Sequence, residues 1–231
     1  MREEFFDIGN IPAVLYGEPA DSVWLFVHGR QGRKEEGADF ARLACPKGAQ
    51  VLALDLPGHG SRQAEACALV PWQAVPELRR VMAYARERWA RVSLRANSIG
   101  AWLSMLAFAA EPPVKSLFVS PVLDMERLIG SMLLWAGVTE EELRRRGKIP
   151  TDFGETLDID YLRYVREHPI DSWPCDTAIL YAGGDCLTER ETVDAFCARF
   201  GCALSVMEQG EHWFHTPEQL RVLEAWTAEN C

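Results

Sequence analysis

The stretch Leu94-Arg95-Ala96-Asn97-Ser98-Ile99-Gly100-Ala101-Trp102 decides the fold of this chain. A short apolar strand pattern runs into Ser98, and an apolar helix pattern follows it. A strand that turns sharply into a helix at a serine exposes the hydroxyl at the tip of the turn. The residues two before and two after must be small, because strand and helix pack closely there. Ala96 and Gly100 meet this requirement, so the stretch predicts a nucleophile elbow with alanine in place of the usual first glycine.

A serine in this position has a second interpretation, since Ser98 could be a plain N-cap of the following helix. Pentapeptides of this kind occur by chance in many chains. The choice between the two interpretations therefore depends on the rest of the sequence.

Length and composition predict one compact domain, and the charge distribution excludes one class of partner. The chain has 231 residues, 48% of them apolar, which suits a single substantial core. Its formal net charge is −10, and its densest basic run, Arg144–Arg146, follows Glu140–Glu142 as on a solvated helix face. Nucleic acid is therefore not expected as a partner.

The termini and the cysteines predict a cytoplasmic protein without a membrane span. Met1–Asp7 lacks the layout of a secretion signal, and no window approaches 18 uncharged apolar residues. An odd number of cysteines without a C-x-x-C motif predicts free thiols and gives little support for a metal site, so we expect no metal or organic cofactor. The seven cysteines are Cys45, Cys67, Cys175, Cys186, Cys197, Cys202 and Cys231.

Strand and helix patterns alternate along most of the chain. Several strand patterns are continuous apolar runs, as expected for parallel strands that are buried on both faces. We therefore predict a doubly wound α/β fold with a mostly parallel sheet. The predicted strands are Ala13–Tyr16, Val23–Val27, Val51–Leu54, Val92–Ala96, Ser116–Val119, Ala178–Tyr181 and Ala203–Met207. The predicted helices are Ala38–Ala44, Val75–Ala90, Ser98–Ala109, Glu189–Phe200 and Pro217–Glu229.

The segment 125–173 interrupts the alternation. It begins apolar, becomes charged and ends aromatic. Irregular connections of this length are uncommon in compact domains. We therefore predict a small helical cap inserted over the strand ends rather than a long surface loop.

Chemically useful side chains follow five of the predicted strands. Active sites of doubly wound sheets collect at the carboxyl ends of the strands, so these residues are the candidates for a site. They are the turn His28-Gly29-Arg30, the loop Asp55-Leu56-Pro57-Gly58-His59-Gly60-Ser61-Arg62, Ser98, the turn Gly183-Gly184-Asp185 and the loop Gly210-Glu211-His212.

Three of these residues suit nucleophilic acyl transfer. The hydroxyl of Ser98 needs a base to remove its proton, and the imidazole of His212 can do so near neutral pH. Asp185 can hold that ring in one tautomer and stabilise its charged form. The N–H groups of Ile99 and Arg30 can serve as the oxyanion hole.

At this point the sequence resembles the α/β-hydrolase family, in particular its esterase- and lipase-like members. The five segments occur in the expected order along essentially the whole chain, and the Asp55–Gly60 loop is typical of the family. The resemblance implies the fold and a Ser–His–Asp mechanism. It also implies that His28 and His59 shape their loops rather than catalyse.

Two of the role assignments have competitors. His215 could replace His212 as the base, although the helix that starts after it predicts a packing or capping role. Asp124 could replace Asp185 as the acid, because some hydrolases of this fold place the acid after the preceding strand, or it could be an N-cap. Asp55 is interpreted as a structural partner of its own loop, and the basic residues after the oxyanion turn, including Lys34, as solvated.

The sequence therefore predicts a serine hydrolase that cleaves a small acyl ester through an acyl-enzyme. Thioesters or amides could replace esters, and the acyl group could pass to an acceptor other than water. The fold also hosts lyases and cofactor-free peroxidases, and a catalytically silent ligand-binding protein is a further alternative. The substrate and the oligomeric state do not follow from the sequence.

Overall fold

The computed structural model describes residues 1–64 and 69–231, which form two compact units. Unit 1 consists of Met1–Leu123 and Ser172–Cys231, and unit 2 consists of Asp124–Asp171. Cys67, one of the expected free thiols, lies outside the described residues.

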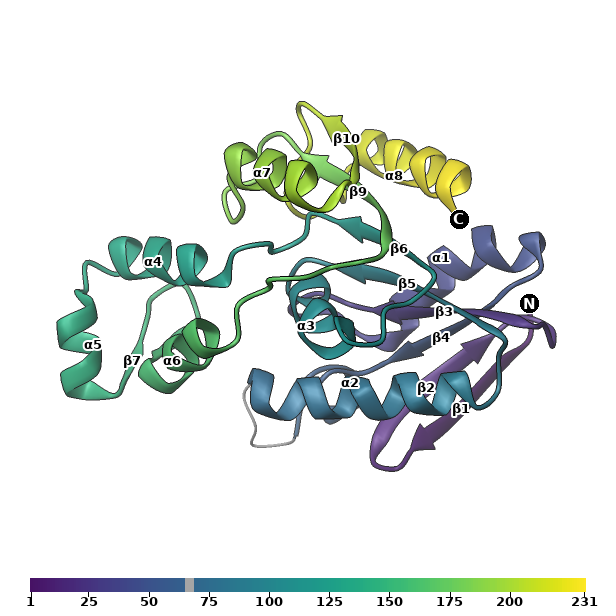
Figure 1. Cartoon of the computed structure of the whole chain (residues 1–231), viewed down its shortest axis with the longest axis horizontal. Helices are drawn as coiled ribbons and strands as arrows, with labels where there is room; N and C mark the ends of the chain where they lie inside the picture. The colour runs from purple at the N-terminus through teal and green to yellow at the C-terminus, as the bar shows by residue number, and fades with distance from the viewer. Residues whose placement is uncertain (65–68) are drawn as a thin grey trace. The chain divides into compact units, whose positions relative to one another are not determined.

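Unit 1 contains a sheet of eight strands with helices along it (Figure 1). Its strands are β1 (Glu3–Ile8), β2 (Ile11–Tyr16), β3 (Ser22–Val27), β4 (Gln50–Leu54), β5 (Arg91–Asn97), β6 (Lys115–Val119), β9 (Asp176–Ala182) and β10 (Ala203–Met207). Its α-helices are α1 (Gly37–Ala44), α2 (Pro71–Arg86), α3 (Ile99–Phe108), α7 (Arg190–Phe200) and α8 (Pro217–Asn230). Short 3₁₀ turns are η1 (Lys34–Glu36), η2 (Cys45–Lys47) and η3 (Gly60–Arg62).

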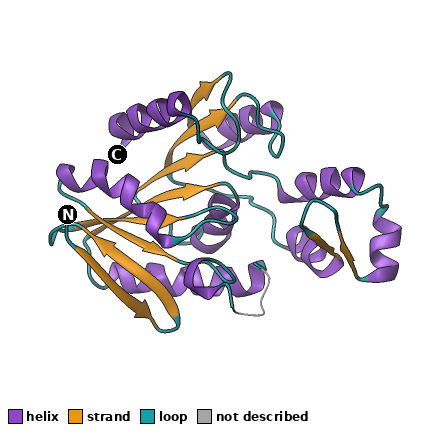
Figure 2. Cartoon of the chain, turned by 180° about the vertical axis from the view of Figure 1, so that it is seen from behind, coloured by secondary structure: helices purple, strands orange, loops and turns teal. Residues whose placement is uncertain are grey.

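The strand order is β1-β2-β4-β3-β5-β6-β9-β10, and every pair from β4 to β10 is parallel (Figure 2). At one edge of the sheet, β1 pairs with β2 and β2 pairs with β4 in the antiparallel orientation. The prediction of a mostly parallel α/β sheet flanked by helices is therefore confirmed.

The apolar residues of the central strands form a hydrophobic core on both faces of this sheet. Every residue of β4 is buried, as is nearly every residue of β3, because both faces of the sheet are covered. Phe40 of α1 and Trp226 of α8 belong to one apolar cluster on the sheet, while α2 packs on α3. This arrangement brings the carboxyl ends of β3, β4, β5, β6, β9 and β10 to one edge.

The observed elements differ from the predicted ones mainly at their ends. Helix α2 begins at Pro71 rather than Val75 and ends at Arg86 rather than Ala90. Pro71 occupies the first helical position, where its missing N–H costs nothing, so it starts the helix a full turn early. Strand β1 was not predicted, because its charged residues hide the pattern of an exposed edge strand.

Unit 2 combines three helices with a small hairpin. Its elements are α4 (Met125–Trp135), α5 (Glu140–Arg146), β7 (Lys148–Pro150), β8 (Thr156–Asp158) and α6 (Ile159–Glu167). The antiparallel pair of β7 and β8 was not expected in a segment predicted to be helical. That this unit acts as a cap remains a prediction.

None of the helices among the described residues combines the length and the apolar character that a membrane crossing requires.

Candidate active site

Ser98 stands at the tip of the turn between β5 and α3. Its backbone angles are φ +49° and ψ −124°, a region that L-residues rarely occupy and that costs roughly 1–3 kcal/mol. Backbone hydrogen bonds hold it there: its N–H donates to Val119 O at 3.0 Å, and its carbonyl accepts from Ala101 and Val122, both at 3.1 Å. Such strain persists only where surrounding structure enforces it.

The structure separates the two interpretations of Ser98. The residue occupies the N-cap position of α3, but within the described chain its side chain makes no capping hydrogen bond. Its Oγ instead lies 2.8 Å from Nε2 of His212. Ser98 therefore terminates the strand as a cap residue does, while its hydroxyl is directed to an imidazole.

Of the two small positions in the elbow, 96 and 100, the packing requires glycine at position 100. A Cβ atom there would collide with the carbonyl oxygen of His28 and lie 2.9 Å from that of Val27. At position 96 the alanine side chain fits, fully buried within β5. The start of α3 therefore rests directly on the backbone at the end of β3, and only its side of the elbow excludes a methyl group.

His212 and Asp185 form the second half of the site. Nδ1 of His212 lies 2.7 Å from Oδ2 of Asp185, whose carboxylate is completely buried. A carboxylate only accepts hydrogen bonds, so Nδ1 carries the proton and Nε2 accepts from the hydroxyl of Ser98. The three predicted residues thus form one continuous chain of hydrogen bonds within unit 1.

The loops after β9 and β10 fix the orientation of Asp185. Oδ1 of Asp185 accepts from the N–H groups of Leu187 at 2.7 Å and Thr188 at 3.2 Å. The N–H of Gly184 donates to Gly210 O at 2.8 Å, which ties the two loops together. The acid and the base are therefore held by a common backbone framework.

The competing residues are engaged elsewhere. Asp124 is exposed and caps α4, where its Oδ1 accepts from Arg127 N at 2.9 Å. His215 directs its Nδ1 to Trp213 O at 2.7 Å and lies 3.4 Å from Glu211 Oε2. Neither residue is part of the hydrogen-bonded chain that contains Ser98.

His28 is buried between the turn after β3 and the loop after β4. Its Nε2 accepts from Leu56 N at 3.0 Å, so Nδ1 carries the proton and donates to Gly29 O at 2.7 Å. Burial lowers the pKa of His28 to about 4, although the hydrogen bond to Gly29 acts in the opposite direction. The neutral ring thus connects the turn after β3 to the loop after β4. His59, whose Nδ1 contacts Pro57 O, packs beside it.

Lys34 corrects one expectation from the sequence, because it is buried rather than solvated. Its Nζ lies 2.7 Å from Oδ2 of Asp55, and its N–H donates to Oδ1 at 2.7 Å. Ser61 also donates to Asp55, through its N–H and its hydroxyl. Burial alone would raise the pKa of Asp55, but these hydrogen bonds outweigh it and lower the pKa below its ordinary value. The sequence around Lys34 does not indicate that this lysine forms a buried ion pair with Asp55.

The two predicted oxyanion donors flank the elbow. Ile99 is the first residue of α3, where N–H groups have no partner within the helix. Arg30 is exposed and follows Gly29, and a Cβ atom on Gly29 would lie 3.2 Å from Cβ of Ser98. The turn after β3 therefore passes next to the serine, and the role of the two N–H groups as an oxyanion hole stays a prediction.

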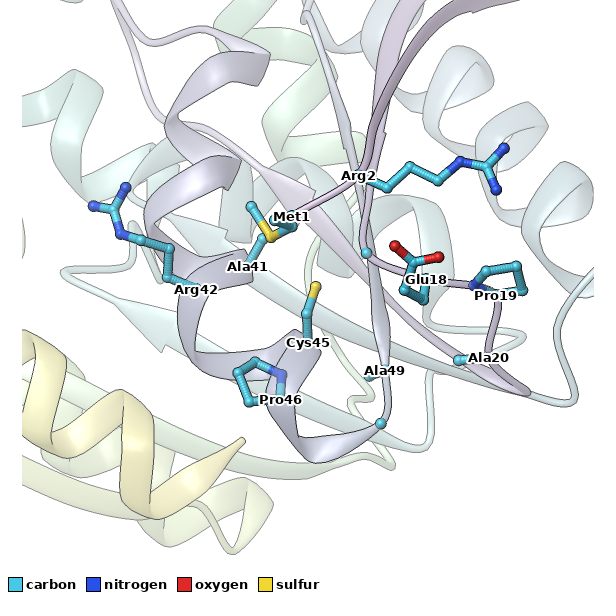
Figure 3. Close-up of a pocket in the computed structure, with 12 residues that line it drawn as sticks. Met1, Arg2, Glu18, Pro19, Ala20, Ala41, Arg42, Cys45, Pro46 and Ala49 are labelled. Atoms are coloured by element: carbon cyan, nitrogen blue, oxygen red, sulfur yellow. The ribbon is translucent and has the colours of Figure 1, made fainter.

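A pocket of about 480 Å³ is lined by other residues of unit 1, which Figure 3 shows. Cys45 lines one side of it and Glu18 and Pro19 the other. The pocket adjoins the amino ends of β3 and β4, whereas Ser98 follows the carboxyl end of β5. A strand of seven residues separates these ends by about 20 Å. The pocket is therefore distinct from the hydrogen-bonded chain.

Comparison with known proteins agrees with the fold described above. A family model described as "Alpha/beta hydrolase family" matches residues 24–230. Est1E from Butyrivibrio proteoclasticus, solved with ferulic acid, is similar with a TM-score of 0.77 and 18% identity over 98% of this chain and 96% of that one. No curated protein is significantly similar in sequence.

Two further solved structures have the same fold. Alpha/beta hydrolase domain-containing protein 10 from mouse gives a TM-score of 0.76 with 13% identity over 99% of this chain and 98% of that one. A thioesterase domain from the curacin biosynthetic pathway gives 0.62 with 17% identity, over 98% and 99%. Together with the family match over nearly its whole length, the fold shows that the chain belongs to the alpha/beta hydrolase family.

Proposed function

We propose that this protein is a serine hydrolase that cleaves small acyl esters through an acyl-enzyme intermediate. The observation that carries the proposal is the chain of contacts Asp185–His212–Ser98, with distances of 2.7 and 2.8 Å, which ends on a strained serine. Hydrogen-bond contacts of this length between nucleophile, base and orienting acid are the signature of an activated nucleophile.

The first half of the reaction transfers the acyl group to the protein. Oγ of Ser98 attacks the carbonyl carbon while Nε2 of His212 takes the hydroxyl proton. Asp185 stabilises the imidazolium through the proton on Nδ1. The N–H groups of Ile99 and Arg30 stabilise the negative oxygen of the tetrahedral intermediate.

Collapse of this intermediate completes the first half, and a second half then releases the product acid. His212 gives its proton to the leaving alcohol as the intermediate collapses to the Ser98 ester. A water molecule then attacks that ester, with His212 again accepting a proton, and the acid departs as Ser98 regains its hydroxyl. No step requires a cofactor.

Thioesters are a second substrate class for the same residues. A thiol leaves more readily than an alcohol, and one similar structure is a thioesterase domain, whereas another is an esterase from Pyrococcus furiosus. We therefore propose oxoesters and thioesters together. A lyase, a peroxidase or a silent binding protein would lack their hydrolysis products.

The proposal is tested first by labelling the protein with a fluorophosphonate, with mass spectrometry used to map the adduct. We expect the adduct on Ser98 only, and none in Ser98→Ala. Ser93→Ala, at the other end of the same strand, is the matched control and should label like the unmodified protein. Folded protein that takes up no label, or a Ser98→Ala variant that labels normally, would refute the proposal.

Product analysis then distinguishes hydrolysis from the other chemistries of the fold. An ester and a thioester of the same acyl group should each yield the free acid in amounts equal to the alcohol or thiol released. Transfer to an added alcohol without acid formation would indicate an acyltransferase instead.

The cytoplasmic location is likewise proposed, on the cysteines alone. The six cysteines in the described part of the chain are free thiols, which suits a reducing compartment. Cell fractionation with an antibody against the protein tests this location, and recovery from an oxidising compartment would contradict it.

A further inference from the structure

Trp213 is the residue of the β10–α8 loop that directly follows His212, and its side chain is 74% exposed. Isolated exposed aromatic side chains are common on protein surfaces and need no explanation by themselves. Trp213 differs from such residues in its position beside the base and in how its ring is held. Consecutive Cα atoms are about 3.8 Å apart, so the backbone of Trp213 lies next to that of the base.

The ring of Trp213 is supported on one face. The imidazole of His215 stacks on it, with ring centroids 4.7 Å apart and an interplanar angle of 19°. Nδ1 of His215 donates to the carbonyl oxygen of Trp213 at 2.7 Å, so a hydrogen bond joins the two residues in addition to the ring stacking. With one face occupied by His215 and most of the side chain exposed, the opposite face is available to a ligand.

His215, which supports the ring of Trp213, is itself anchored to α8. The N–H of His215 donates to Oε1 of Gln219 at 3.0 Å, and Nε2 of Gln219 donates to Glu211 Oε2 at 3.3 Å. Gln219 is buried and belongs to the capping box of the helix with Thr216. The loop is thus tied at its base, and an indole held in this way loses little conformational freedom when it binds a ligand.

We propose that Trp213 is a specificity-determining residue whose free face stacks on a neutral aromatic ring of the substrate, next to the ester bond. The inference rests on the proposed ester hydrolysis. An aromatic ring gains from offset stacking on indole beyond the burial of apolar area, which a saturated ring of the same size does not. The carboxylate of Glu211, two residues away and 61% exposed, disfavours an anionic substituent on that ring.

The test compares esters that differ only in the planarity of one ring. Methyl phenylacetate and methyl cyclohexylacetate place the ring on the acyl side, and benzyl acetate and cyclohexylmethyl acetate place it on the alcohol side. In at least one pair, kcat/KM for the aromatic member relative to the saturated member should fall roughly twofold to tenfold in Trp213→Ala. The pair that responds identifies the side of the ester on which Trp213 acts.

Two further substitutions separate stacking from bulk. Trp213→Leu retains apolar volume without an aromatic face and should lose the same preference, whereas Trp213→Phe should keep most of it. Phe5→Ala removes another exposed aromatic side chain, from edge strand β1, four strand spacings or about 19 Å from β5. It should leave the preference unchanged. An equal loss for aromatic and saturated esters, or no loss in Trp213→Ala, overturns the proposal.

Binding to a Ser98→Ala background decides the question even if ester hydrolysis itself fails. The same four esters are titrated into Ser98→Ala and into Ser98→Ala/Trp213→Ala, with affinity measured by NMR. We expect an aromatic ester to bind more tightly than its saturated partner only when Trp213 is present. Absence of that preference refutes the role of Trp213, whereas hydrolysis of none of the esters by the unmodified protein refutes the proposed function.

Discussion

Oδ2 of Asp185 lies 2.7 Å from Nδ1 of His212, while Oδ1 of the same carboxylate accepts two backbone hydrogen bonds from its own loop. The carboxylate therefore cannot rotate without losing contacts on both oxygens. This double restraint fixes the imidazole, because the proton on Nδ1 has a single buried acceptor in line with it.

Replacing Asp185 with asparagine should lower kcat by about 10²–10⁴ with little change in fold, because an amide can hold the ring in the wrong tautomer. Asp124→Asn is the matched control. Asparagine caps helices as well as aspartate, so α4 should keep its start and kcat should stay within about twofold. Steady-state kinetics on one ester measures both variants. The opposite pattern would show that Asp124 is the acid.

Gly100→Ala should reduce both activity and stability. The new methyl group would meet the backbone oxygens of His28 and Val27, which cannot move aside as a side chain does. We expect a loss of roughly 1–3 kcal/mol in urea unfolding and a fall in kcat/KM of at least about tenfold, because the oxyanion turn is displaced.

The control for this substitution is Gly130→Ala. Gly130 lies inside α4, and nothing lies within 4 Å of a Cβ placed there. The same change should therefore raise the stability of α4 by roughly 0.5–1 kcal/mol. If Gly100→Ala were equally harmless, the close packing of the elbow on β3 would be wrong.

His28 should make the protein less stable as the pH falls from 6.5 to 4. The folded state holds the ring neutral down to its lowered pKa of about 4, whereas the unfolded chain binds a proton below about 6.5. Unfolding is therefore favoured increasingly across this window, by about 3 kcal/mol at its acid end, and the effect is absent above it.

This dependence is measured by urea unfolding at several pH values. His28→Gln has no titrating ring, so its stability should fall less between pH 6.5 and 4 than that of the unmodified protein. His168→Gln is the control for removal of an exposed histidine. Equal slopes for His28→Gln and the unmodified protein would contradict the buried neutral ring.

The ion pair between Arg62 and Glu77 should show strong coupling. Both side chains are buried, and two hydrogen bonds of 2.6 and 3.0 Å join the guanidinium to the carboxylate. Arg62→Met should cost roughly 3–5 kcal/mol, because it leaves a buried carboxylate without its partner. Arg62→Met/Glu77→Leu should cost clearly less than the sum of the two single changes. Additive losses in urea unfolding would argue against the pair.

The sequence was informative wherever a pattern has one physical meaning. Ala96-Asn97-Ser98-Ile99-Gly100 could be interpreted because a sharp turn between strand and helix admits only small residues. The apolar strands could be interpreted because a sheet covered on both faces favours apolar residues. The same argument placed Asp185 and His212 at strand ends, which brought them to the same edge as Ser98.

Other features depend on neighbours that are distant in the sequence. Lys34 resembles any surface lysine until Asp55, 21 residues later, is placed beside its ammonium group. Strand β1 has too few apolar residues to be predicted from its own sequence. It is recognised as a strand by its pairing with β2. The hairpin of β7 and β8 consists of two three-residue strands, shorter than any periodicity can reveal.

Unit 2 enters the chain between β6 and β9, which are hydrogen-bonded neighbours in the sheet. Its removal would leave every strand of that sheet with the same partners. A parallel pair still needs a crossover of about a dozen residues, so a shorter connection can replace the insertion but a tight turn cannot. Insertions of other lengths and folds can therefore occupy this position without any change in the strand pairing that supports the elbow.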